Sequence, residues 1–198
     1  MNTTVKRVSA TAAVALSAGV AAEVVGHRAF GRLVQRDVQT LLAQASPAAG
    51  RADVVTEEML ADLPDPARRY LRYAGVVGRP FARTVRLRQR GRMRPGPGQP
   101  WMAIDAQEWY SVYPPSFVWD GTLHVGPIPV GRARDMYRDG HGHMLVKVAS
   151  LFTVVDATGE ETDQASMTRY LSEMIWFPTA FLGDNVSFEA VDDRSVRV

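Results

Sequence analysis

The chain has 198 residues and a net charge of +2, and its 46% apolar and 22% charged residues are ordinary for one globular domain with an N-terminal appendage. The absence of cysteine excludes disulfides, thiolate metal sites, thiol catalysis and a lipid-modified N-terminal cysteine. Residues 1–94 have a net charge of +9 and residues 95–198 one of −7. The two halves should therefore attract each other within one fold, and no nucleic-acid partner is expected.

Residues 1–22 have the pattern of a signal peptide or a membrane anchor. Lys6 and Arg7 form a short positive segment, residues 8–22 carry no charge, and small residues before Glu23 offer a weak cleavage site. This uncharged stretch is short for a membrane span, which needs about 20 residues. A cleaved signal and an uncleaved anchor stay open as alternatives, beside an ordinary amphipathic helix. Either of the first two predicts a location in the cell envelope, with membrane contact through the N-terminus.

Residues 23–55 are expected to form an amphipathic helix followed by a linker at residues 46–50. The apolar residues recur at helical spacing, whereas Arg32, Arg36 and Gln39 occupy the other face. The apolar positions are Phe30, Leu33, Val34, Val38, Leu41 and Leu42.

Residues 56–198 are expected to form an α+β domain that begins with two short helices. The first spans residues 57–62, with Thr56 as its cap. The second spans residues 67–74 and should place Tyr70, Leu71 and Tyr73 against the core, before glycines end it.

Strands follow, and the first, at residues 84–94, alternates cleanly between two faces. One face carries only arginines, which could bind a polyanion or lipid head groups. The preferred interpretation is a solvated outer face paired with carboxylates such as Asp105 on the neighbouring strand. The arginines are Arg86, Arg88, Arg90, Arg92 and Arg94.

The next strand, at residues 101–112, directs Glu108 to the same side as its apolar residues. An inward carboxylate can act as a general base with a raised pKa. More often such a group is hydrogen-bonded to a nearby Tyr or Arg, which is the interpretation preferred here.

A strand starting at Phe117 precedes a β-hairpin built from residues 133–137 and 144–152. His141 and His143 share a face of this hairpin and form a possible metal pair. A stable site needs a third and a fourth ligand, and spacing fixes neither, so no metal site is expected.

Residues 159–183 are expected to form one long helix between strands. Thr162 or Asp163 can cap it, and Pro178 should stop or kink it near Trp176. Its buried stripe is expected to exclude Arg169, Ser172 and Glu173. The segment that leaves the helix is very apolar, and it either fills the core or forms a lid over an apolar cavity. The stripe consists of Met167, Tyr170, Leu171, Met174, Ile175 and Phe177.

Four stretches together resemble a family of uncharacterised bacterial proteins, a domain of unknown function common in actinobacteria and proteobacteria. They are LPDPARRYL at residues 63–71, YSVYPPSFVW at 110–119, DGHGHM at 139–144 and EMIWFPT at 173–179. The resemblance covers residues 60–198 and implies no activity. It implies an N-terminal membrane-anchoring helix and, since members continue past the position of Val198 with more β-hairpins, a chain truncated at its C-terminus with an exposed sheet edge. More loosely, the element order resembles the half-barrel of periplasmic lipoprotein carriers, a curved antiparallel sheet with one inserted amphipathic helix.

No nucleotide-binding, nucleophile-elbow, zinc-protease or EF-hand motif is present, and no cofactor is expected. The favoured hypothesis is a cell-envelope protein, not an enzyme, that binds a lipid or other apolar small molecule between sheet and helix. One alternative is a small enzyme using Glu108, Glu173, Asp139 or the two histidines. Another is a structural membrane-associated domain without a ligand. The side chains expected to line the ligand site are Tyr110, Phe117, Trp119, Met174, Trp176 and Phe177.

Overall fold

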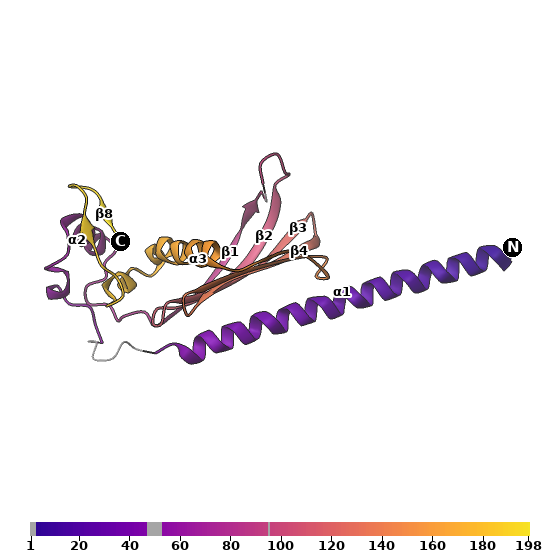
Figure 1. Cartoon of the computed structure of the whole chain (residues 1–198), viewed down its shortest axis with the longest axis horizontal. Helices are drawn as coiled ribbons and strands as arrows, with labels where there is room; N and C mark the ends of the chain where they lie inside the picture. Colours follow the sequence, from indigo (N-terminus) through magenta and orange to yellow (C-terminus); the bar gives the residue numbers. More distant parts are fainter. Residues whose placement is uncertain (1–2, 47–52, 95) are drawn as a thin grey trace.

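A six-stranded antiparallel sheet lies between two helices in the computed structural model, which describes residues 3–46, 53–94 and 96–198, without the side chains of residues 3–18 and 20. Helix α1 (Thr3–Gln44) runs along one face and α3 (Glu160–Glu173) covers part of the other (Figure 1). The described strands pair in chain order, which leaves β1 and β6 as open edges. This is the predicted α+β fold with a helix inserted between strands. The strands are β1 (Thr84–Met93), β2 (Met102–Ser111), β3 (Ser116–Val125), β4 (Ile128–Arg138), β5 (His141–Val148) and β6 (Phe152–Ala157).

Helix α1 packs on the sheet through the apolar stripe of its C-terminal half. The buried residues Phe30, Val34, Val38 and Leu41 recur at the helical period and form one cluster with apolar side chains of β3, β4 and β5. Asp37 extends this contact, because its carboxylate accepts a 2.7 Å hydrogen bond from Arg134 of β4. Leu42, which was also assigned to the stripe, is largely exposed.

The backbone of α1 is one continuous helix from Thr3 to Gln44, without a break at residue 22. In the part of the chain that the structure describes, no helix combines the length and the apolarity needed to cross a bilayer. The predicted linker at residues 46–50 lies almost entirely outside the described residues.

Two short helical segments precede the sheet, η1 (Glu58–Leu60) and α2 (Asp65–Tyr73). Leu60 and Leu71 are fully buried in the larger core cluster, and the burial of Leu71 was predicted. The prediction for Tyr73 was wrong, because this residue is 92% exposed at the end of α2. A helix of nine residues cannot bury both Tyr73 and Leu71, which lie about 200° apart around the axis.

The inserted helix ends earlier than its apolar pattern. Regular α-helix stops at Glu173 and is followed by the 3-10 turns η2 (Met174–Trp176) and η3 (Pro178–Leu182). The predicted caps were wrong, since Gly159 occupies the N-cap position without a side-chain cap. Asp163 instead accepts a 2.7 Å hydrogen bond from the backbone N–H of Gly142 and thereby fastens α3 to β5. A two-stranded ribbon, β7 (Glu189–Ala190) and β8 (Val196–Arg197), closes the described chain.

Candidate functional site

The strand register aligns one row of side chains beneath α3. Leu87, Glu108, Trp119, Asp135 and Met144 are successive partners across β1 to β5. Because the strands alternate, this row faces the helix, and the arginines of β1 face the opposite side. The sheet therefore presents two carboxylates to the helix.

Arg169 of α3 points into this row and contacts three carboxylates. Its Nη2 donates to Glu108 at 2.8 Å, its Nη1 donates to Asp135 at 2.7 Å, and its Nε donates to Glu173 at 3.0 Å. We call these four residues the Arg169 cluster. Glu108 has no exposed surface at all, and Asp135 is also buried. The sequence prediction that Arg169 and Glu173 lie off the buried side of the helix was therefore wrong.

A second set of hydrogen bonds holds the two glutamates of the cluster. The hydroxyl of Tyr110 donates to Glu173 at 2.8 Å, and Gln89 donates to Glu108 at 2.9 Å. The Trp119 indole N–H in turn donates to Gln89 at 2.7 Å, which fixes the orientation of the amide. Polar groups in a buried network of this kind constrain one another, so the cluster is rigid.

The cluster is short of positive charge, because one guanidinium faces three carboxylates. Burial raises the pKa of Glu108 to about 7; the charge of Arg169 opposes this rise and Glu173 adds to it. Burial also raises the pKa of Asp135, again against the effect of Arg169. Glu108 therefore titrates near neutral pH, and the cluster becomes more negative as the pH rises.

A groove of about 340 Å³ runs beside α3 and reaches the cluster. Asp135 and Arg169 form its polar inner end, and Glu161 lies at the helix N-terminus. Apolar side chains contribute most of the remaining wall. We call this hollow the α3 groove; it is lined by Asp135, Met144, Ala157, Glu161, Thr162, Ala165, Ser166 and Arg169.

The sheet and α3 lie in the part of the chain that matches a known protein family. A family model described as a family of unknown function, DUF6544, matches residues 53–198. The chain belongs to this family. No curated protein and no solved structure was found to match. The DUF6544 region contains the whole Arg169 cluster and the α3 groove, whereas α1 precedes it.

The six side chains predicted to bind a ligand all belong to the DUF6544 region, but they differ in accessibility. Trp119 is partly buried above Gly121, and Trp176 is 47% exposed. The other four are buried in the larger core cluster, in which the ring centres of Tyr110 and Phe177 lie 4.8 Å apart. Their contact with a ligand stays a prediction. The space that a ligand could enter lies beside these residues, in the α3 groove. The four are Tyr110, Phe117, Met174 and Phe177.

The apolar segment after α3 also borders a second hollow, of about 260 Å³, on the side of α2. Ile175 and Phe181 contribute to its wall, together with Tyr70, Leu71 and Phe188. Phe181 is at the same time part of the core. The segment thus fills the core with some side chains and borders an apolar hollow with others.

Of the residues considered for catalysis, only Glu108 and Glu173 share a partner, because both accept hydrogen bonds from Arg169. Asp139 lies at the turn between β4 and β5, next to Arg138. His141 is bound to Asp163, and His143 lies 2.7 Å from Asp156. Among the described residues, no group of three or more His, Asp or Glu side chains is arranged to hold a metal ion.

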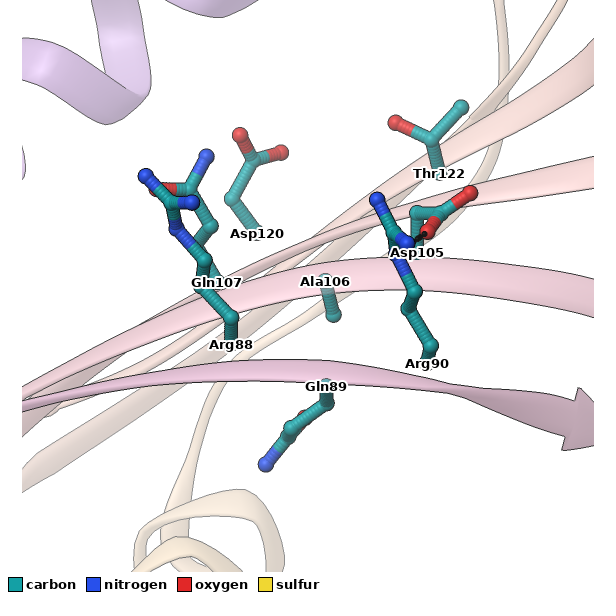
Figure 2. Close-up of a pocket in the computed structure, with 8 residues that line it drawn as sticks. All are labelled: Arg88, Gln89, Arg90, Asp105, Ala106, Gln107, Asp120 and Thr122. Atoms are coloured by element: carbon teal, nitrogen blue, oxygen red, sulfur yellow. Dashed lines mark ion pairs between the residues drawn. The ribbon is translucent and has the colours of Figure 1, made fainter.

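The arginine face of β1 lies on the side of the sheet that α1 occupies. Figure 2 shows Arg88 and Arg90 beside Asp105, Gln107 and Asp120, with Gln89 pointing to the opposite face. Arg90 pairs with Asp105 at 3.0 Å, as predicted. Both partners are exposed, so this pair contributes at most about 1 kcal/mol. The hollow here, about 350 Å³, contains charges of both signs.

Sequence reasoning identified Glu108 but missed Asp135 and Arg169. Asp135 shares the inward face of β4 with Ala133 and Tyr137, so the alternation used for Glu108 also marks it. Arg169 lies next to buried Tyr170 and four residues before Glu173. A helical pattern of apolar residues cannot reveal an inward arginine, because two of its three carboxylate partners come from distant strands.

Proposed function

We propose that this protein is a non-catalytic binding protein of the cell envelope that holds an apolar small molecule or lipid in the α3 groove. The head group of this ligand is cationic or donates hydrogen bonds. One observation carries the proposal: an apolar groove ends at a buried cluster in which three carboxylates share one guanidinium.

The charge of the cluster favours such a head group. Each of the three guanidinium nitrogens of Arg169 donates to a carboxylate, so an anionic ligand would add a fourth negative charge beside a single guanidinium. The carboxyl groups of Glu108 and Asp135 have raised pKa values because burial penalises their charge. A cation placed against Asp135 would supply the charge that the cluster lacks.

The groove suits the apolar part of the ligand. Its volume falls within the ordinary range of small-molecule pockets, about 300–1,000 Å³. Met144, Ala157 and Ala165 offer apolar contacts along its length. The buried aromatic cluster beneath α3 holds the helix in place, which keeps the groove preformed.

Binding is favoured over catalysis because the strongest candidate for a general base is inaccessible. Glu108 has a pKa suited to proton transfer near neutral pH, but its side chain has no exposed surface. A substrate that enters the groove meets Asp135 and Arg169 first. The enzyme alternative requires an opening of α3 that uncovers Glu108.

Placement at the cell envelope rests on the N-terminal sequence, in which Lys6 and Arg7 precede an uncharged segment at residues 8–22. Fractionation of cells that express the full chain tests it. Recovery with the membranes or as an exported protein supports this location, and recovery with the cytosolic proteins contradicts it.

Three probes of equal chain length test the ligand proposal: octylamine, octanol and octanoate, titrated into the full chain at pH 8. We expect octylamine to bind most tightly and octanoate most weakly. Ala165→Trp, at an exposed position in the groove wall, should abolish octylamine binding. The matched variant Ile175→Trp, which fills the second hollow, should leave it unchanged.

The reverse pattern contradicts the proposal. Loss of octylamine binding in Ile175→Trp alone would show that the ligand binds in the hollow beside α2. Tightest binding of octanoate would show that the site selects anions.

A further inference from the structure

Three turns gather at one end of the sheet. Strands β1, β3 and β5 end there and β2, β4 and β6 begin there, because all neighbouring strands are antiparallel. The described residues of these turns are 94, 96–101, 126–127 and 149–151. The α3 helix and the α2 region lie toward the other end (Figure 1).

Large apolar side chains are exposed around these turns. Single exposed apolar residues are normal on a protein surface, but a group contributed by three adjacent turns marks an interaction site. We call this group the turn rim. Its members, which are between 37% and 68% exposed, are Trp101, Val125, Ile128, Val148, Leu151 and Phe152.

The charge at this end has one sign. Residues 91–104, 123–131 and 145–155, which form the three turns and the adjoining strand ends, contain no Asp or Glu. They contain Arg92, Arg94 and Lys147. The guanidinium of Arg94 lies over the Trp101 ring, 5.4 Å from its centre. An exposed Trp–Arg pair beside apolar residues is the composition that bilayer interfaces favour.

Helix α1 leaves the sheet at this same end. At the opposite end, the N–H of Ser46 donates to the carbonyl of Tyr113. Near the turns, Gly26 approaches so closely that a β-carbon would lie 2.6 Å from the carbonyl oxygen of Ser150. The residues before Gly26 therefore extend past the turn rim (Figure 1). In this extension Glu23 is the sole acidic residue, and residues 8–22 are uncharged.

From these observations we infer that the turn rim binds the surface of an anionic lipid bilayer. The apolar side chains of the three turns enter the interfacial layer, and Arg92, Arg94 and Lys147 face the lipid head groups. The extension of α1 reaches the same bilayer, so the domain has two attachments instead of one. This inference adds a contact surface to the cell-envelope location proposed above, and it is independent of the α3 groove.

Charge distinguishes a bilayer from a second copy of the chain as the occupant. Two copies that met through this end would bring the same positive charges together without an acidic partner. An anionic bilayer complements them, and each basic residue near such a surface contributes about 1 kcal/mol. The apolar contribution scales with the area that enters the interface.

Vesicle partition of the full chain tests the inference. We expect it to bind phosphatidylglycerol–phosphatidylcholine vesicles at least about ten-fold more tightly than pure phosphatidylcholine vesicles. The double variant Ile128→Asp with Phe152→Asp should bind the phosphatidylglycerol-containing vesicles at least about ten-fold more weakly than the wild type does. The control variant Ile175→Asp, which alters a similarly exposed side chain away from the rim, should bind as the wild type does.

Fluorescence adds a readout that does not depend on a variant with altered charge. Brominated lipids should quench Trp101, and Trp101→Phe should lose most of the quenching, whereas Trp176→Phe retains it. Octylamine binding should stay unchanged in the double rim variant, which separates this inference from the α3 groove.

Two results would overturn the inference. One is unchanged vesicle binding in the double rim variant together with unquenched Trp101, which would leave α1 as the membrane contact. The other is a dimer in buffer that becomes a monomer in the double rim variant, which would assign the rim to a second copy of the chain.

Discussion

The guanidinium of Arg169 lies 2.8 Å from the carboxylate of Glu108, which has no exposed surface. This contact joins the C-terminal half of α3 to strand β2. It also places a group that titrates near neutral pH inside the DUF6544 region. Stability and ligand binding should therefore share one pH dependence.

Glu108→Gln should remove part of the pH dependence of stability. The pKa of Glu108 in the folded protein, about 7, lies above its ordinary value of 4.5. The folded state thus holds this proton more tightly than the unfolded chain, so its contribution is present below pH 4.5 and is lost as the pH rises through 7. Relative to wild type, the variant should gain roughly 2–3 kcal/mol in its free energy of unfolding between pH 5 and pH 8. Urea unfolding of both proteins at pH 5 and pH 8 measures this difference. An equal change in the free energy of unfolding between the two pH values in both proteins would refute the prediction.

Arg169→Met should destabilise the protein strongly, since it leaves three carboxylates without their countercharge. Removing one partner of a buried ion pair costs about 3–5 kcal/mol. The loss should be larger at pH 8 than at pH 5, where Glu108 can be protonated. The control is Arg90→Met, because Arg90 is 89% exposed and its pair with Asp105 contributes at most about 1 kcal/mol. Equal losses in the two variants would show that the cluster has no special role.

Gly121→Ala should displace the Trp119 ring. A β-carbon at Gly121 would collide with this ring, whose N–H holds Gln89 and, through it, Glu108. Overpacking of this kind typically costs about 1–3 kcal/mol. The tryptophan emission should change as well. Gly131→Ala is the matched control on β4, where the nearest atom would lie at an ordinary 3.5 Å; a loss in the control as large as that in Gly121→Ala would argue against a specific clash.

Phe30→Ala should loosen α1 from the sheet. Phe30 is buried against β3 and β4, and the Arg132 guanidinium lies 4.6 Å from its ring centre. Truncation of a buried Phe costs about 3–5 kcal/mol. Hydrogen exchange of the α1 amides in residues 27–44 should accelerate more than a hundred-fold, up to the rate set by global unfolding. Leu42→Ala, at an exposed position of the same helix, should leave the exchange rates almost unchanged.

The sequence predicted β1 and β2 well, because the alternation of their side chains depends on local pattern alone. The strand expected at residues 144–152 was wrong, since β5 ends at Val148 and a turn at residues 149–151 precedes β6. The arginine face of β1 and the inward Glu108 both follow from a period of two, and both were confirmed. The apolar stripe of α1 was also predicted from its helical spacing, apart from Leu42. By contrast, Tyr73 was misplaced, because a short helix with flanking apolar residues permits more than one buried face.

The Arg169 cluster was harder to predict, because its members come from three separate segments. Glu108 and Asp135 lie on different strands, and Arg169 and Glu173 lie on the helix that crosses them. Pairing among these residues depends on the strand register and on the position of α3, and neither is encoded in a local pattern. The α3 groove depends on the same long-range geometry.

The carboxyl carbon signal of Glu108, followed by NMR during a pH titration with and without octylamine, tests the central claim most directly. A cation bound at the inner end of the α3 groove should stabilise the charged form and lower the pKa of Glu108 below 7. Glu108→Gln assigns the signal. An unchanged or raised pKa at saturating octylamine would contradict the proposal that the ligand head group supplies the positive charge missing from the cluster.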